Sequence, residues 1–171
     1  TGLAQSLARP GGNVSGMSLF SEQLNTKRLE VLREVAPRAR RFGVVFGSSG
    51  LPSMELVLKA GRDLGLDVKM IAVQSLDDLD ARLGSPDLEQ LDAFLVGTDG
   101  FLDAIPARVV LPINRLRRPA IFPDKPYAEV GGLASYGVDY GEMFVRLAGM
   151  VDRVLRGATP ATMPFEQPER F

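Results

Sequence analysis

Apolar residues recur along the chain in two alternating patterns, and together these patterns predict an α/β fold. Short apolar runs predict strands over residues 41–47, 67–73, 93–97 and 119–122, and the first of them is apolar on both faces, as is typical of buried parallel strands. Apolar residues spaced three or four apart predict helices between and beside them, over residues 21–36, 52–64, 76–83 and 102–117. This alternation is typical of a parallel sheet with helices on both faces.

Two of these helices carry further expectations. In the helix over 21–36, the apolar face contains Leu29 and Leu32, and we expect Lys27 and Arg28 to lie largely away from it. In the helix over 102–117, Pro112 predicts a kink or a split into two helices, because proline removes a backbone donor.

Glycine-rich segments bracket this α/β block at residues 10–16 and 131–137. Before the first segment, residues 2–9 predict a short helix that ends at the Pro-Gly-Gly sequence. After the second, we expect a helix over 140–156 and an extended tail. The apolar face of that last helix contains Phe144, Leu147, Val151 and Val154. The chain therefore has the layout of one that leaves a first lobe, builds a second and returns.

Composition excludes several classes of function. The 171 residues have a net charge of −1 with the two signs interspersed, so we expect no binding to nucleic acid. Cysteine, histidine and tryptophan are absent, which excludes thiol chemistry, Cys/His metal sites and the commonest general base. We therefore expect no metal, no cofactor and no enzymatic activity. No apolar run approaches the ~20 residues that span a bilayer.

The candidate binding residues follow the predicted strands, because ligands of open parallel sheets bind at the carboxyl ends of the strands. The loop after the first strand offers hydroxyl and backbone donors at the start of a helix, and a serine helix cap is the alternative explanation. After the third strand, Asp99 is a candidate partner for an ammonium group, with an Asp-Gly turn as the alternative. The full set of candidates is Ser48, Ser49, Ser53, Thr98, Asp99, Asp124, Ser135, Tyr136 and Gly137.

For two of these candidates the structural explanation is at least as strong. Asp124 lies in a Pro-Asp-Lys-Pro segment of common turn residues. Tyr136 suits ordinary packing at a sheet edge. Asp99 and Asp124 could in principle form a carboxylate pair, but no activated nucleophile accompanies them.

Three segments closely resemble a family of bacterial ABC-transporter substrate-binding proteins. They are Gly2-Leu3-Ala4-Gln5-Ser6-Leu7-Ala8-Arg9-Pro10-Gly11-Gly12-Asn13-Val14-Ser15-Gly16, Lys27-Arg28-Leu29-Glu30-Val31-Leu32 and Glu129-Val130-Gly131-Gly132-Leu133-Ala134-Ser135-Tyr136-Gly137. The tail over 164–171 is similar to the approach to that family's last strand, so the resemblance covers essentially the whole chain.

The resemblance implies two α/β lobes of the type I periplasmic-binding-protein kind, extracytoplasmic and often lipid-anchored. By that analogy residues 17–132 form the second lobe, while residues 1–16 and 133–171 are hinge crossings and parts of a first lobe that is largely absent here. Ser48, Ser49 and Ser53 match the family's polar loop, Thr98 and Asp99 its Thr-Asp loop, and Ser135, Tyr136 and Gly137 its hinge. The sequence departs from the family at 47–50, where many relatives have an Asn-Pro pair.

We therefore expect this chain to belong to the solute-binding component of an ABC importer, which captures a small molecule and delivers it to a membrane permease. The preferred candidate for that molecule is an amino acid, aromatic amino acids included. A ligand-sensing domain of a cytoplasmic transcriptional regulator is the alternative, and a small carboxylate-dependent α/β enzyme is a third hypothesis. The last helix lacks a partner sheet in this chain, so we also expect self-association.

Overall fold

The computed structural model describes residues 2–19 and 21–171, and the chain divides into two compact units. Residues Thr1–Phe20 and Val138–Phe171 form one, here called the terminal unit. Residues Ser21–Gly137 form the other, here called the sheet unit.

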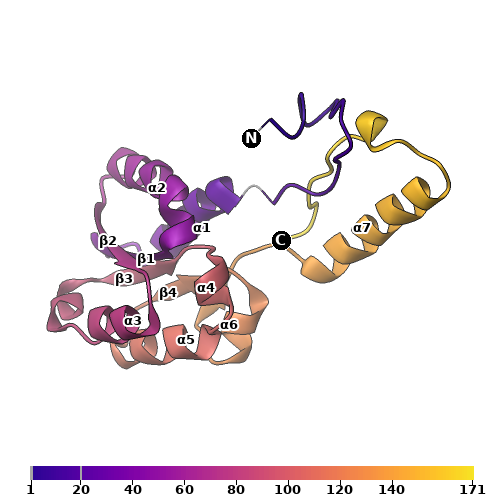
Figure 1. Ribbon diagram of the computed structural model, residues 1–171. Coiled ribbons are helices and arrows are strands. Elements are labelled where there is room, and N and C mark those ends of the chain that lie inside the picture. Colours follow the sequence, from indigo (N-terminus) through magenta and orange to yellow (C-terminus); the bar gives the residue numbers. More distant parts are fainter. Residues whose placement is uncertain (1, 20) are drawn as a thin grey trace. The chain divides into compact units, whose positions relative to one another are not determined.

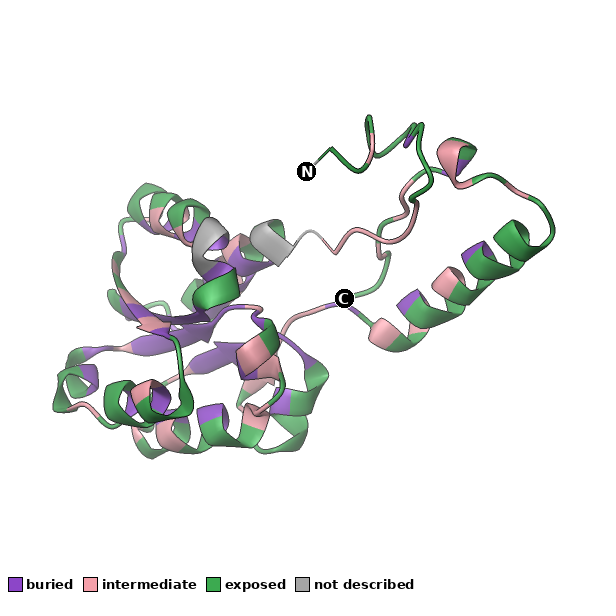
Figure 2. Ribbon diagram, viewed as in Figure 1, coloured by how far each residue is buried: buried purple, intermediate pink, exposed green. Residues whose placement is uncertain are grey.

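The sheet unit contains a five-stranded parallel sheet with the order β2-β1-β3-β4-β5, which confirms the predicted α/β class (Figure 1). Its strands are β1 (Arg41–Gly47), β2 (Asp67–Val73), β3 (Ala93–Val96), β4 (Ala120–Phe122) and β5 (Ala134–Ser135). In the register at the centre of the sheet, Val44 of β1 lies beside Met70 of β2 and Leu95 of β3. The central strands are buried on both faces, as their continuous apolar runs require (Figure 2).

Helices cover both faces of this sheet, and each face has its own core. On one face, Leu29 of α1 (Ser21–Val35) and Val57 of α2 (Leu51–Asp63) pack with Phe46. On the other face, Leu79 and Leu102 pack with strand side chains such as Phe94. The elements on that second face are α3 (Leu76–Leu83), η2 (Pro86–Gln90), α4 (Gly100–Asp103), α5 (Pro106–Arg115) and α6 (Lys125–Glu129).

The strand order creates a switch point between β1 and β3. From β1 the chain first moves outward to β2, then returns past β1 to build β3, β4 and β5. The connections after β1 and β3 therefore leave in opposite directions, and this strand order predicts a crevice at the carboxyl ends of these two strands. The turn η1 (Ser48–Gly50) and residues 97–99 lie at this switch point.

The helix predicted over 102–117 is two helices, and the break is not at Pro112. Asp99 accepts hydrogen bonds from the backbone N–H groups of Phe101 and Leu102, so α4 begins at Gly100, earlier than predicted. The chain then restarts as α5 at Pro106, where proline is tolerated in the first turn. Pro112 lies inside α5, which continues through it.

In the terminal unit, the short helix expected over residues 2–9 is not formed, and these residues adopt bends and irregular backbone. Their segment is instead held by the tail. The Phe165 N–H donates to the Leu7 carbonyl at 2.8 Å, and the Ser15 hydroxyl donates to the Met163 carbonyl at 2.8 Å. A parallel bridge joins Met17 to Glu166.

The last helix, α7 (Tyr140–Leu155), begins where predicted but buries different residues. Asp139 caps it by accepting from the Glu142 N–H at 3.1 Å. Met143 and Met150 are buried, whereas the predicted inward residues Phe144 and Val151 are 60% and 52% exposed. Val154 is also exposed, and Leu147 lines an apolar hollow of about 300 Å³. Residues 13–16, Pro160 and Met163 of the terminal unit line this hollow together with α7.

Among the described residues, the structure contains no helix that is both long enough and apolar enough to cross a membrane.

We predict that the chain of residues 1–171 self-associates through the exposed face of α7, because apolar patches of this kind seldom remain exposed to water. Light scattering over a range of concentrations should show an apparent mass above 18.5 kDa. Val145→Glu and Leu155→Glu, at positions 73% and 81% exposed, should lower it. A monodisperse monomer at high concentration would contradict the prediction.

Candidate functional site

A buried arginine of α1 joins the carboxyl ends of three strands of the sheet unit. Arg28 is 1% exposed. Its Nε donates to the Tyr136 carbonyl at 2.6 Å, and its Nη2 donates to the Pro123 carbonyl at 3.0 Å. Its Nη1 donates to the Thr98 hydroxyl at 2.9 Å. The acceptors follow β5, β4 and β3, so a single guanidinium holds three loops of the candidate site.

Asn25, one turn before Arg28, completes this buried polar cluster. Its Oδ1 accepts from Arg28 Nη1 at 2.6 Å and from the Thr98 N–H at 3.3 Å. Two donors face this oxygen, which fixes the orientation of the amide. Its Nδ2 is buried and has no hydrogen-bond partner among the described residues. The cluster therefore contains one unsatisfied donor, which is rare in protein interiors.

Asp99 occupies the switch point with both carboxylate oxygens engaged. It is 2% exposed. Oδ1 accepts from the backbone N–H groups that begin α4, and Oδ2 accepts from the Ser49 hydroxyl and, at 3.1 Å, from the Gly50 N–H. Asp99 thus fastens the loop after β1 to the loop after β3, across the crevice that the strand order predicts.

Glycine is required where these loops meet the carboxylates. A Cβ on Gly47 would lie 2.1 Å from Asp99 Oδ1, and a Cβ on Gly137 would lie 2.0 Å from the Pro123 carbonyl oxygen and 2.3 Å from Asp124 Oδ1. The Asp124 side chain, 7% exposed, therefore lies against the end of the segment that follows β5.

A third carboxylate lies beside Asp99 and Asp124. Asp103 of α4 accepts from the Tyr127 hydroxyl at 2.9 Å, and the Tyr127 ring stacks on Phe122 with the ring centroids 5.5 Å apart. Burial, together with the negative charges of Asp124 and Asp99, raises the pKa of Asp103 to about 6, although the Tyr127 hydrogen bond opposes this. The pKa of Tyr127 is raised too, chiefly by burial.

The structure gathers most of the predicted candidates along one edge of the sheet, while their role in binding stays a prediction. Ser49 with Asp99 forms one contact pair, and Asp124 with Gly137 forms another. Ser48 is exposed beside Ser49, and Ser53 is buried in the first turns of α2. Ser135 is the last residue of β5. The Tyr136 side chain packs against the core formed with α1 and α2, as the packing alternative predicted.

Sequence reasoning missed Asn25, Asp103 and Tyr127, and it placed Arg28 wrongly. Arg28 was expected away from the apolar face, yet it is buried because it lies four residues after Leu24 and four before Leu32, both of which are buried. That spacing is a signal in the sequence. The acceptors that satisfy the guanidinium come from loops 70 to 108 residues distant in the chain, and no local pattern shows them.

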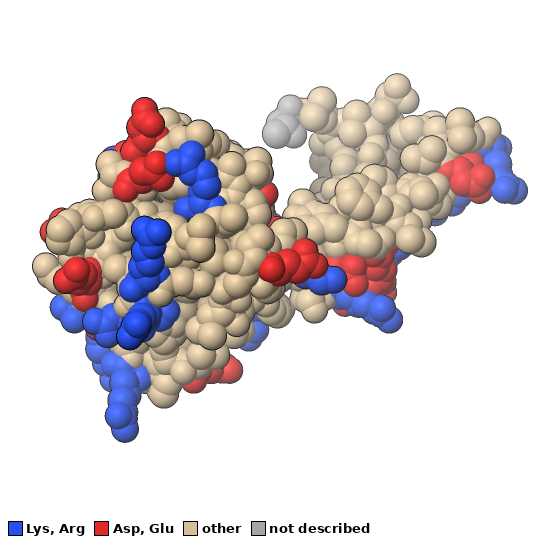
Figure 3. Space-filling view, turned by 90° about the horizontal axis from the view of Figure 1, so that it is seen from below, with Lys and Arg blue, Asp and Glu red and all other residues tan. Residues whose placement is uncertain are grey.

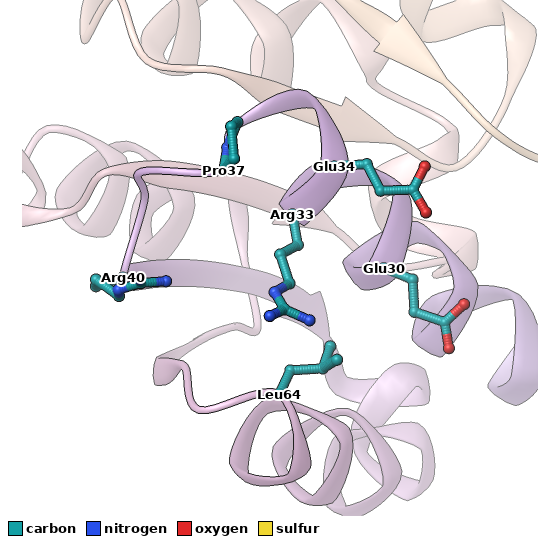
Figure 4. A pocket seen from close by; sticks show the side chains of 6 residues that line it. All are labelled: Glu30, Arg33, Glu34, Pro37, Arg40 and Leu64. Carbon is teal, nitrogen blue, oxygen red and sulfur yellow. The ribbon is translucent and has the colours of Figure 1, made fainter.

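A hollow in the sheet unit lies away from these residues (Figure 4). Its volume is about 480 Å³, and it is lined by Glu30, Arg33, Glu34, Pro37, Arg40 and Leu64. Arg40 directly precedes β1, so this hollow is at the amino end of the sheet, opposite to the strand-end loops. Figure 4 shows the side chain of Arg33 extending towards Leu64.

Charge on the surface is mixed in sign. Figure 3 shows acidic and basic side chains on the same face, in keeping with the net charge of −1. In the terminal unit, Arg146 and Arg153 each pair with Glu166 at 2.9 Å. Among the described residues, no three or more His, Cys, Asp or Glu side chains are grouped to hold a metal ion.

The model of the family described as "ABC transporter substrate binding protein" matches residues 1–171. The chain belongs to this family. A curated relative, the tyrosine-binding protein of Clostridioides difficile (strain R20291), is 25% identical over 166 residues, which are 95% of this chain and 47% of the relative.

Solved structures show the same relationship. An ABC domain in complex with L-Trp from Streptococcus pneumoniae superposes with a TM-score of 0.85 at 26% identity, covering 98% of this chain and 57% of that one. A ligand-free, open substrate-binding protein with adhesive properties from Clostridium difficile superposes with a TM-score of 0.69 at 25% identity. That match also covers 98% of this chain and 57% of the other. The chain thus spans about half of the length of these family members.

We predict that Asn25→Ala destabilises the protein by about 1–2 kcal/mol, because the variant removes the acceptor of one Arg28 Nη1 hydrogen and of the Thr98 N–H. Loss of the unsatisfied amide donor offsets part of the cost. Gln23→Ala, at an exposed position of the same helix, is the control and should change stability by less than about 0.5 kcal/mol. Equal unfolding free energies of the two variants in urea would contradict this.

We predict that Asp103→Asn makes stability less dependent on pH. The raised pKa means that the folded protein binds this proton more tightly than the unfolded chain, so the stabilising contribution is present below about pH 4 and is lost as pH rises through about 6. Because Asp103 is partly exposed, we expect the variant to gain only about 1 kcal/mol at pH 7 and little at pH 4.

The control is Asp63→Asn, which removes an exposed carboxylate of α2. Thermal unfolding at pH 4 and pH 7 measures both variants. An Asp103→Asn protein that is less stable than wild type at pH 7, or equally shifted at both pH values, would refute the assignment.

Proposed function

We propose that the complete protein is the solute-binding component of an ABC importer, and that its ligand is an amino acid, aromatic ones included. The observation that carries the proposal is the coincidence of two features. The chain belongs to a substrate-binding family over all 171 residues, and its polar strand-end residues lie at the switch point of a doubly wound sheet. The names of a tyrosine-binding relative and of an L-Trp complex support the ligand class.

In this proposal the ligand lies against the carboxyl ends of β1 and β3. The exposed hydroxyls of Ser48 and Ser49 and the N–H groups that open α2 bind its carboxylate, since a helix N-terminus favours an anion. The ligand ammonium competes with the Ser49 hydroxyl for the Asp99 carboxylate. Thr98 and Ser135 add neutral hydrogen bonds, and Asp124 adds negative charge beside Gly137.

The proposal includes no chemical step. Members of this family are typically extracytoplasmic, and we place the complete protein in the periplasm or on the outer side of the cytoplasmic membrane, held by a lipid anchor and delivering to an ABC permease. Closure around the ligand is the expected mechanism of capture. We prefer it to the sensor-domain alternative because the family match covers the whole chain.

We predict that the complete protein binds L-tyrosine or L-tryptophan in isothermal titration calorimetry, and that Asp99→Asn weakens binding about tenfold or more by removing a charge-assisted bond. Asp63→Asn is the matched control and should bind like wild type. Asp99→Asn binding as tightly as wild type would overturn the ammonium role.

A wider panel tests the ligand class itself. Thermal-shift measurements with the common amino acids should show stabilisation by mass action for at least one of them. If none of them stabilises the wild-type protein or binds to it, the proposed function is wrong.

A further inference from the structure

Arg28 differs from an ordinary buried ion because three of its hydrogen-bond acceptors lie in three different loops of the candidate site. Its Nε, Nη1 and Nη2 donate to acceptors that follow β5, β3 and β4. Two of these acceptors are backbone carbonyls, of Tyr136 and Pro123, so the guanidinium fixes the path of the chain itself. A planar fork of five donors suits this task, whereas an ammonium group presents its donors from one point.

The positions of these acceptors relate them to binding. Thr98 precedes Asp99, and Pro123 precedes Asp124. Tyr136 precedes Gly137, the last residue of the sheet unit. Each bond therefore holds the neighbour of a candidate residue. At 1% exposure the Arg28 side chain is screened from solvent and cannot itself contact a ligand.

We infer that Arg28 is a positioning residue for ligand binding, which sets the relative placement of the Thr98–Asp99, Pro123–Asp124 and Tyr136–Gly137 segments. This inference rests on the proposed function. Asn25 assists by holding Nη1 at 2.6 Å and by accepting from the Thr98 N–H. Loss of the fork leaves the sheet in place and lets the three segments move relative to one another.

The test uses the complete protein with Arg28→Lys, Arg28→Met and Thr98→Val, and with Lys27→Met as the matched control. Lys27 neighbours Arg28 on α1, but its ammonium is exposed and pairs with Glu30 at 3.0 Å. Binding of L-tyrosine and L-tryptophan is measured at a temperature where circular dichroism shows every compared variant folded. Arg28→Lys covers the case in which Arg28→Met fails to fold.

Of L-tyrosine and L-tryptophan, we consider whichever the wild-type protein binds. We expect Arg28→Lys to bind it about tenfold or more weakly than wild type, and Lys27→Met to bind it with wild-type affinity. In the double variant Arg28→Lys/Thr98→Val, the loss of binding free energy should be smaller than the sum of the two single losses, because both substitutions break the same Arg28–Thr98 hydrogen bond. An Arg28→Lys protein that binds like wild type would overturn the inference.

A second readout needs no ligand and separates positioning from general stability. In amide NMR spectra, Arg28→Lys should shift Thr98, Asp99, Asp124, Tyr136 and Gly137, and should leave Arg41 and Asp92, at the amino end of the sheet, unchanged. If wild type binds neither probe, the proposed function fails, while these spectra still test Arg28. Unmoved site amides, or equal shifts at both ends of the sheet, would refute the positioning role.

Discussion

A guanidinium that leaves water must find acceptors for its N–H groups, and in the sheet unit Arg28 finds them at the ends of three strands. The carbonyls of Tyr136 and Pro123 and the hydroxyl of Thr98 belong to segments that follow three neighbouring strands, and the guanidinium bonds to all three beyond the last strand pairs. Burial makes the constraint strong, since losing any one partner leaves a charged donor uncompensated. We infer that the geometry of the loops after β3, β4 and β5 depends strongly on this side chain.

The parallel sheet provides the frame on which this constraint acts. Its order predicts a crevice at the carboxyl ends of β1 and β3, and there Asp99 of the loop after β3 bonds to Ser49 and Gly50 of the loop after β1. Arg28 and Asp99 therefore act on adjoining parts of one edge, because Thr98 and Asp99 are neighbours in the chain. The hollow at the amino end is lined by none of the candidate residues, and our proposal places binding at the opposite edge of the sheet.

The sequence was most informative about features that arise from local patterns. Apolar runs such as Phe42–Phe46 and apolar spacing at Leu29 and Leu32 predicted strands and helices correctly, since burial follows directly from periodicity. The start of α4 at Gly100 could not be predicted in this way. The Asp99 cap starts the helix two residues earlier than periodicity indicates, so Gly100 and Phe101 are helical and not part of a loop. Residues 2–9 contain good helix formers, but their backbone is held by the tail over 161–166 instead.

Hydrogen bonds between side chains and segments that are distant in the sequence could not be predicted from local patterns. Asp99 was identified as a carboxylate at a strand end, yet its bonds to Ser49 and Gly50 depend on how two loops meet. Arg28 was expected on the solvated face of its helix, and Asp103 was not considered at all. Their burial follows from the packing of α1 and α6 against the strand ends, which requires the assembled sheet.

The central claim is that the carboxyl edge of the sheet unit binds the ligand. A crystal structure of the complete protein with L-tyrosine or L-tryptophan tests it most directly. We predict ligand density in hydrogen-bonding contact with the segments after β1 and β3, at Ser48–Ser49 and Thr98–Asp99, with Arg28 behind them and out of contact. Ligand bound instead in the hollow between Arg33 and Leu64, with the strand-end segments unoccupied, would contradict the account.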